Sequence, residues 1–218
     1  MQQSMFVLNA VNTVANHLLL ELRDPEAQSH RGNFRRNLVK LGQILAYELS
    51  KSLHYNEIEV DTVLGRSKIN TIKEPPVLFT IIRAGLPFLE GFQQFFENSD
   101  CGFVGAHRNE GHEEEISVSL GYTAIPPFGN KDLILVDPML ATGKSLVSAL
   151  EVILEKDSPK MLHLAFAIAA PEGIEYIKQK VNIPHKIWVG AVDDHLNKDS
   201  YIVPGLGDAG DLLFGNKI

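Results

Sequence analysis

Residues 133–145 read Leu-Ile-Leu-Val-Asp-Pro-Met-Leu-Ala-Thr-Gly-Lys-Ser, and this stretch decides the fold that we expect. The apolar run Leu133–Val136 predicts a buried strand that ends at the acid Asp137. Small residues follow, and a helix is predicted from Lys144 to Glu155. Small side chains let backbone N–H groups approach an anion, and a helix start adds unpaired N–H groups and a positive dipole end. The pattern predicts a phosphate-binding loop between a strand and a helix.

The last three residues of this stretch, Gly143-Lys144-Ser145, also match the end of a Walker A loop. That motif requires a second glycine five residues before Gly143, and this chain has Pro138 there. Proline has no backbone N–H to donate and a fixed φ angle. The sequence therefore favours a phosphate loop of another kind over a nucleoside-triphosphate site, and the remaining alternative is an ordinary strand-to-helix turn.

From residue 77 onward, short apolar runs alternate with helical stretches. This alternation is typical of an α/β fold with a mainly parallel twisted sheet flanked by helices. The predicted strands are Val77–Ile82, Gly102–Ala106, Leu133–Val136, Met161–Ala169 and Ile187–Val192, and the predicted helices are Leu86–Phe96, Lys144–Glu155 and Pro171–Gln179. Ligands of such sheets bind beyond the carboxyl ends of the strands. We therefore expect four loops to meet at one cleft, namely residues 83–85, 107–108, 137–145 and 202–210.

The remaining segments complete a single expected domain. Helical periodicity predicts helices at Asn12–Leu22 and Asn33–Ser50, and alternation predicts a β-hairpin at His54–Lys73. A half-exposed strand at Glu115–Tyr122 is interpreted as part of a flap over about residues 108–124. The domain, residues 1–218, then consists of N-terminal helices and a hairpin (1–76), a core sheet with the flap (77–192) and a C-terminal hood (193–218).

Composition excludes several classes of function. The chain has 218 residues and 44% hydrophobic content, which suffices for one sizeable core. No apolar run approaches the roughly 20 residues that span a bilayer, and the N-terminus lacks the basic start of a secretory signal, so no membrane association is expected. The single cysteine, Cys101, favours a cytoplasmic location. The formal charge of -7 argues against a nucleic-acid partner.

Three segments resemble one enzyme family. The run Asp137–Gly143 is similar to the phosphoribosyl-pyrophosphate (PRPP) loop of the type I phosphoribosyltransferases, and specifically of the uracil phosphoribosyltransferase family. Tyr201–Asp211, reading Tyr-Ile-Val-Pro-Gly-Leu-Gly-Asp-Ala-Gly-Asp, resembles the family's uracil-binding segment. Ile81–Leu86 is similar to its Leu-Arg-Ala-Gly turn. The resemblance covers residue 77 to the C-terminus, and residues 1–76 match more loosely.

The resemblance implies a reaction: transfer of the 5-phosphoribosyl group from PRPP to N1 of uracil, which gives uridine monophosphate (UMP) and pyrophosphate in pyrimidine salvage. It implies Mg²⁺ held mainly through the substrate, with Asp208 as a candidate neighbour on the protein side, and a homodimer or higher homo-oligomer. Some relatives are activated by GTP, and the sequence leaves that property open here. No covalent nucleophile is implied.

The resemblance also assigns residues. The uracil-binding set is Ile202, Gly207, Asp208 and Ala209. Charge stabilisation is assigned to Arg83, Arg108 and Asp208, since guanidinium groups make paired bonds to phosphate oxygens. The PRPP-binding set is Arg83, Arg108, Asp137, Pro138, Met139, Leu140, Ala141, Thr142, Gly143, Lys144, Ser145 and Asp208.

Two residues depart from the family pattern. Lys144 replaces a glycine, and we expect it to have helical geometry, with its ammonium group either facing solvent or assisting the phosphate. Leu212 replaces an arginine that is common in relatives, which would alter subunit or effector contacts.

Several other patterns carry weaker hypotheses. The run Gly205–Gly210 fits the dinucleotide fingerprint, but too few residues follow it for a βαβ unit. Asp193-Asp194-His195 has metal-ligand residue types, although successive residues of an extended chain point apart. The cluster Arg31, Arg35 and Arg36 is interpreted as a solvated or subunit-contact face. The alternative functions are a non-catalytic regulatory relative that binds UMP or PRPP, and a phosphoribosyltransferase for another base.

Overall fold

The computed structural model describes residues 5–108 and 118–216 of the chain. Within these ranges, one mixed sheet has the strand order β1-β9-β8-β7-β4-β5-β6. Its strands are β1 (Met5–Val7), β4 (Val77–Ile82), β5 (Cys101–Arg108), β6 (Val118–Ala124), β7 (Asp132–Leu140), β8 (Met161–Ala169) and β9 (His185–Val192). All neighbouring strands pair in parallel except β5 and β6, which are antiparallel. The expected mainly parallel α/β fold is confirmed.

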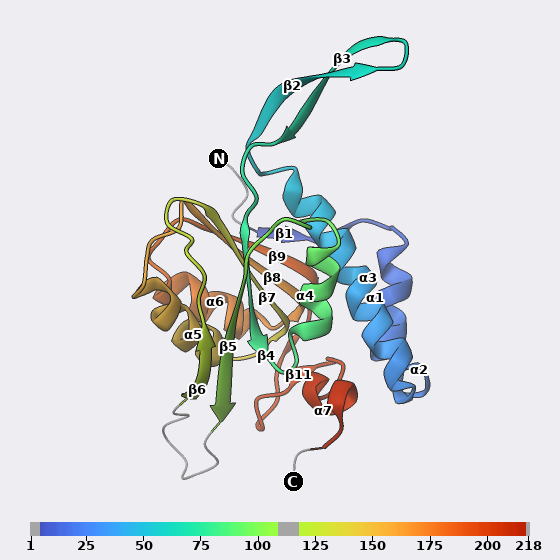
Figure 1. Ribbon diagram of the computed structural model, residues 1–218. Helices are drawn as coiled ribbons and strands as arrows, with labels where there is room; N and C mark the ends of the chain where they lie inside the picture. The colour runs from blue at the N-terminus through green and yellow to red at the C-terminus, as the bar shows by residue number, and fades with distance from the viewer. Residues whose placement is uncertain (1–4, 109–117, 217–218) are drawn as a thin grey trace.

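Helices cover both faces of this sheet (Figure 1). One face packs against α1 (Ala15–Arg23), α3 (Arg31–Ser50) and α4 (Leu86–Gln93), and the other packs against α5 (Lys144–Leu154) and α6 (Pro171–Lys180). Successive side chains of a strand point to opposite faces. Accordingly, Ile134 and Val136 belong to the first core, and Leu133 and Leu135 belong to the second.

The N-terminal segment adds elements that the sequence pattern did not indicate. Strand β1 pairs with β9 at the sheet edge, where Phe6 is opposite Trp188. A 3-10 helix, η1 (Leu8–Ala10), and the short helix α2 (Pro25–Ser29) lie on either side of α1. Elements of three to five residues are too short to show a clear hydrophobic period.

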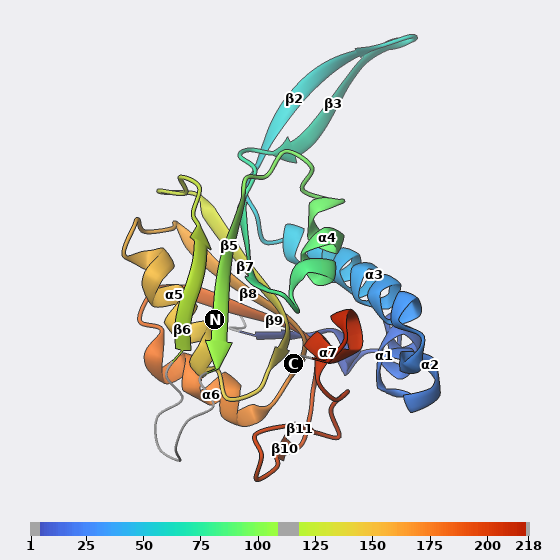
Figure 2. The same cartoon turned by 60° about the horizontal axis from the view of Figure 1, so that its bottom comes forward.

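The predicted hairpin is confirmed as β2 (Tyr55–Thr62) and β3 (Gly65–Ile72), which pair in full antiparallel register. Figures 1 and 2 show that it projects away from the sheet and helices. Val63 lies in the turn beside Leu64, and both side chains are almost completely exposed. The hairpin therefore exposes both of its faces.

Strand β7 was expected to end at Asp137, and this prediction was wrong. The strand continues to Leu140 because Met139 and Leu140 pair with Ile168 and Ala169 of β8. Pairing between β7 and β4 ends at Val136, so the strand beyond it is bonded on one side. Such an edge position tolerates a proline, here Pro138.

The predicted flap strand is confirmed from residue 118 to 122 as part of β6, while the part of the flap at residues 109–117 lies outside the described residues. The C-terminal segment forms a two-stranded sheet of β10 (His195–Leu196) and β11 (Ile202–Val203), followed by α7 (Ala209–Phe214). Figure 1 shows α7 at the end of the molecule to which β4 points. Within the described ranges, no helix has both the length and the apolar character required to cross a membrane.

Candidate functional site

The loop between β7 and α5 has the geometry of a helix start. Gly143 is the N-cap residue with φ of 78°, a left-handed conformation that suits glycine, and Lys144 is the first helical residue. A Cβ atom on Gly143 would lie 3.1 Å from Cδ1 of Tyr176, so space is tight as well. The expectation that Lys144 has helical geometry is confirmed. The glycine that this loop needs is therefore at position 143, and the departure from the family pattern at 144 causes no backbone strain.

The turn after β4 places Arg83 beside the C-terminal helix. The peptide between Ile82 and Arg83 is cis, and the Gly85 N–H donates to the carbonyl of Ile81 at 3.1 Å. The guanidinium carbon of Arg83 lies 5.6 Å from the ring centroid of Phe214, at the end of α7. That of Arg35, on α3, lies at the same distance from the same ring. A cation over an aromatic face is attracted by the ring quadrupole, so Phe214 is placed to orient Arg83.

The glycine-rich loop runs from β11 to α7. Ile202 begins it and is buried, and Asp208 ends it as the N-cap of α7, where Oδ1 of its side chain accepts a hydrogen bond from the Asp211 N–H at 3.0 Å. The carboxylate also suits the positive end of the helix dipole. Asp208 is exposed, so its carboxylate faces the solvent side of the loop.

These three loops line one cavity of about 230 Å³. The residues lining it that the sequence predicted are Arg83, Asp137, Pro138, Met139, Ala141, Ser145, Gly207, Asp208 and Ala209. It is also lined by Ile81, Ile82, Ala84, Ser200, Tyr201 and Gly210. The structure thus brings the phosphate loop, the Arg83 turn and the glycine-rich loop together, although their sequence positions span more than half of the chain.

Other predicted site residues lie beside the cavity rather than on it. Leu140 and Ile202 are buried in the two hydrophobic cores. Thr142, Gly143 and Lys144 belong to the loop but are not among the residues lining the cavity, and Lys144 is exposed. Arg108 is the last residue of β5 and pairs with Val118. Its side chain lies outside what the structure describes.

The acid Asp193 has a structural partner. Its carboxylate forms a two-point ion pair with Arg23, with one contact of 2.5 Å and one of 2.8 Å. The Gly205 N–H donates a further hydrogen bond to it at 2.8 Å. Across the described parts of the chain, no group of three or more His, Cys, Asp and Glu side chains could hold a metal ion. The weak metal hypothesis for residues 193–195 is therefore wrong, because Asp193 is used to hold the glycine-rich loop.

The arginine cluster at the start of α3 binds the C-terminal helix. Nε of Arg31 donates to the Leu212 carbonyl at 3.3 Å, and both Nε and NH2 of Arg35 donate to the Leu213 carbonyl at 3.0 and 2.5 Å. Cations suit the C-terminal end of a helix, where carbonyls are unpaired. All three arginines are exposed, as the interpretation of a solvated face predicts, and Arg31 and Arg35 in addition connect α3 to α7 of the same chain.

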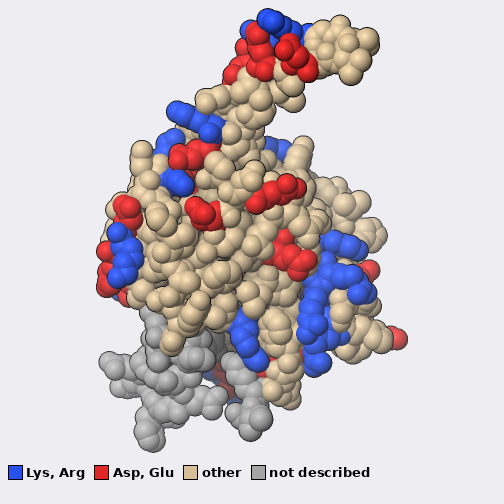
Figure 3. All heavy atoms as spheres, viewed as in Figure 1, with Lys and Arg blue, Asp and Glu red and all other residues tan. Residues whose placement is uncertain are grey.

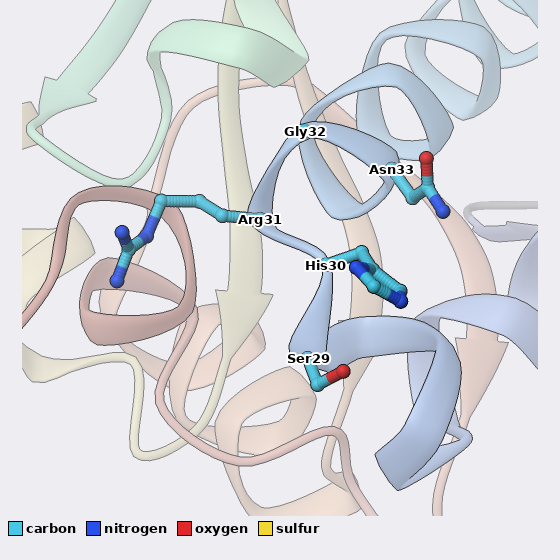
Figure 4. A pocket seen from close by; sticks show the side chains of 5 residues that line it. All are labelled: Ser29, His30, Arg31, Gly32 and Asn33. Carbon is cyan, nitrogen blue, oxygen red and sulfur yellow. The ribbon is translucent and has the colours of Figure 1, made fainter.

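A second hollow lies at the start of α3 (Figure 4). It is lined by Ser29, His30, Arg31, Gly32 and Asn33. Arg31 extends toward α7, whereas His30 and Asn33 point to the other side of the helix start. The side chains do not converge on a common point, so we assign no site to this hollow.

The fold and the site together define a class of α/β protein. In it, a strand, a predicted phosphate-binding loop and a helix face a glycine-rich loop across a cavity. The family model for uracil phosphoribosyltransferase matches residues 10–216. Uracil phosphoribosyltransferase of Porphyromonas gingivalis is 39% identical over 211 residues, which cover 97% of this chain and 98% of the relative. That of Pyrococcus furiosus is 38% identical over 205 residues, which cover 92% of this chain and 86% of the relative.

A solved structure agrees with this relationship. The AQ2163 protein from Aquifex aeolicus has a TM-score of 0.86 and 38% identity, with 98% of this chain and 99% of that chain covered. The family resemblance expected from three short segments is confirmed and extends to the N-terminal region. The chain belongs to the uracil phosphoribosyltransferase family.

Proposed function

We propose that this protein transfers the 5-phosphoribosyl group from PRPP to N1 of uracil, giving UMP and pyrophosphate. Family membership supports the reaction. The observation that carries it is the shared cavity, where Arg83 and the phosphate loop face Gly207 and Ala209. A phosphorylated sugar and a flat base can therefore be held side by side.

The phosphate half would use the β7–α5 loop and the turn after β4. Ala141 and Ser145 line the cavity beside the N-terminus of α5, where unpaired N–H groups and the helix dipole favour an anion. Arg83 would bind the pyrophosphate, and Asp137 would accept hydrogen bonds from the ribose hydroxyls. We assign Arg108 to the pyrophosphate as well, because it ends the neighbouring strand β5.

The base half would use the glycine-rich loop. One edge of uracil presents an acceptor, a donor and an acceptor, which two backbone N–H groups flanking one carbonyl would match. Cytosine presents a different pattern and would leave backbone groups unpaired, which costs their desolvation energy. We assign this edge to the backbone of Gly207 to Ala209, with Ile202 buried beneath it.

Mg²⁺ fits this cavity because Asp137 and Asp208 both line it, and carboxylate oxygens are ligands that this cation prefers. When bound with PRPP, the cation would neutralise phosphate charge. We propose that it is held mainly through the substrate, with Asp208 the nearest protein ligand. The cavity then needs less positive charge from a chain whose net charge is -7.

The transfer itself would need no covalent nucleophile. The bond from C1 of the ribose to the pyrophosphate oxygen breaks, the bond from C1 to N1 of uracil forms, and N1 loses its proton. Arg83 and Arg108 would stabilise the charge on the leaving pyrophosphate, and the two loops would hold the reacting atoms in line.

One assay tests this proposal: pyrophosphate release from PRPP, measured in parallel with uracil, cytosine, orotate and hypoxanthine. Turnover with uracil at least 100-fold above the other bases is expected, on the discrimination that unpaired polar groups provide. Turnover with a different base would identify another phosphoribosyltransferase. Binding of UMP or PRPP without turnover would identify a regulatory relative.

We further propose a cytoplasmic homodimer or higher homo-oligomer. The projecting hairpin supports association with a second copy, because an isolated two-stranded hairpin is marginally stable in water and this one exposes Ile58, Val60, Val63 and Leu64. Figure 3 shows charged side chains along the hairpin and an uncharged tip. The free, half-buried thiol of Cys101 is compatible with a reducing compartment.

A further inference from the structure

The end of helix α1 is bonded directly to the glycine-rich loop. NH1 of Arg23 donates both to Oδ2 of Asp193 at 2.8 Å and to the Gly205 carbonyl at 3.0 Å, while NH2 donates to Oδ1 of Asp193 at 2.5 Å. The Gly205 N–H completes the arrangement by donating to Oδ2 of Asp193. Both backbone polar groups of Gly205 are thus bonded to one ion pair.

This ion pair is withdrawn from solvent. The side chain of Asp193 is 3% exposed and that of Arg23 is 24% exposed. A buried carboxylate is tolerated when its oxygens are paired and hydrogen-bonded. Here the planar guanidinium contacts both oxygens, a match that fixes direction as well as distance. The pair can therefore set the position of the backbone that it holds.

The ion pair holds the backbone of Gly205, where the conformation of the loop is tightly restricted. Gly205 has φ of 64°, and a Cβ atom there would lie 2.1 Å from the Ile202 carbonyl oxygen. Two residues later, Gly207 begins the part of the loop that lines the cavity. Nε2 of Gln28, from α2, reaches the next carbonyl, that of Leu206, at 3.4 Å. A shift at Gly205 would therefore move the lining residues.

We propose that Arg23 and Asp193 are positioning residues that hold the base-binding loop in its competent geometry and so determine affinity for the pyrimidine base. Neither residue lines the cavity, so they act through Gly205. The expected change in kinetics rests on the proposed function, whereas the loop geometry rests on the hydrogen bonds among Arg23, Asp193 and Gly205. It assigns a function to the N-terminal segment, whose residues from 5 onward are not among those that line the cavity.

Arg23→Lys is the main test variant. Lysine keeps the charge, but its ammonium group cannot reproduce the guanidinium fork that contacts Asp193 at two points and Gly205 at a third. The KM for uracil is expected to rise about tenfold or more, because small displacements of a positioning group have effects of this size. The KM for PRPP is expected to change less than about twofold, since the phosphate loop is untouched. Asp193→Asn should show the same split.

The matched control is Arg36→Lys, on the same N-terminal segment, where the guanidinium bonds to Asn33 within the first turn of α3. It should leave both KM values unchanged. A second readout needs no turnover: amide hydrogen exchange in residues 202–210 should accelerate in Arg23→Lys, while exchange in residues 144–154 stays as in the wild type.

The outcomes separate the two proposals. Wild-type protein that is inactive with uracil counts against the proposed function, and the exchange measurement still decides whether Arg23 holds the loop. Unchanged exchange in the loop overturns the positioning role. If the wild type is active, two results for Arg23→Lys would also overturn the positioning role. One is an equal rise in the KM for uracil and the KM for PRPP, and the other is a lower melting temperature with both KM values unchanged.

Discussion

At the scale of single residues, the phosphate loop shows which position requires glycine. Gly143 carries the positive φ angle, and Lys144 begins the helix with its side chain exposed. An L-residue in the left-handed region costs roughly 1–2 kcal/mol. The unusual residue 144 is therefore compatible with an intact loop, because the conformational demand lies one residue earlier.

Two substitutions test these different roles of Gly143 and Lys144. Lys144→Ala should change the KM for PRPP less than about twofold, because the ammonium group is exposed and not on the cavity. Gly143→Ala should raise the KM for PRPP and lower the free energy of unfolding by about 1–2 kcal/mol, the cost of the left-handed backbone. Steady-state kinetics and urea unfolding measure both effects. A tenfold rise in KM for Lys144→Ala would show instead that its ammonium contacts the substrate.

Residue patterns predicted the site unevenly. The phosphate loop, Arg83 and the glycine-rich loop were identified because each is a short local motif with unusual residues. Arg23 was missed, since nothing in the helix around it distinguishes it from a surface arginine. Its partner Asp193 was noticed only as a possible metal ligand. A charged residue that acts through a distant partner has no local signal in one sequence.

At the scale of elements, α3 and α4 are in close contact on one face of the sheet. Helix α4 follows the turn that contains Arg83, so this contact helps to fix the position of that turn. Both helices approach through glycines: a Cβ on Gly42 would lie 2.6 Å from the Phe88 carbonyl oxygen, and one on Gly91 would lie 2.2 Å from that of Val39. Both obstacles are backbone atoms, which cannot rotate away. The two glycines therefore set the distance between the helix axes.

Gly91→Ala tests this packing. The added methyl group should lower the free energy of unfolding by about 1–3 kcal/mol, the usual cost of overpacking, despite the better helix propensity of alanine. Gly32→Ala is the control, because its Cβ would meet only the end of the Arg36 side chain, at 3.4 Å. Equal stability of the two variants would mean that the helices separate without cost.

The order of strands and helices was largely predictable, because buried strands and amphipathic helices show their periods in ten residues or fewer. The elements that were missed are all short, with two to six residues each, namely β1, η1, α2, β10, β11 and α7. Their stability comes from tertiary partners: β1 from pairing with β9, and α7 from the arginines of α3. The division of the chain into residues 1–76, 77–192 and 193–218 stays a prediction.

At the scale of the whole molecule, a buried histidine links folding to pH. His163 is 2% exposed and accepts a hydrogen bond at Nδ1 from Nε1 of Trp188, at 3.1 Å. Burial, with a smaller contribution from the charge of Lys186, lowers the pKa of His163 from 6.5 to about 4. Protonation would place a charge in the core and remove the acceptor. The folded state therefore favours the neutral ring.

This pKa predicts a pH dependence of stability. Between pH 6.5 and about 4 the unfolded chain binds a proton at this position and the folded chain does not, so the free energy of unfolding falls as the pH falls. The loss should approach about 3 kcal/mol, at 1.36 kcal/mol for each unit of pKa shift. His163→Asn retains an acceptor for Trp188 without a titrating group. Urea unfolding across this range should show a flatter profile for this variant, and parallel profiles would contradict the assignment.

The exposed tip of the β2–β3 hairpin leads to a prediction about the oligomeric state. Val63 and Leu64 are 100% and 98% exposed at its tip, and burying both in a second copy would remove their apolar surface from water. Val63→Ser combined with Leu64→Ser should shift the protein toward the mass of one chain in sedimentation equilibrium. Leu20→Ser, at an exposed position on α1, should not. A wild-type protein that sediments as one chain would refute the proposed oligomer.

The sequence by itself determined the alternation of strands and helices, the phosphate loop and the glycine-rich loop, because each depends on residues that are neighbours along the chain. Tertiary structure decided which distant groups meet. Arg23 and Asp193 are 170 positions apart, and Arg35 reaches Leu213 across 178. Such contacts depend on how the layers pack rather than on any local period. They make the N-terminal helices the support of the C-terminal loop.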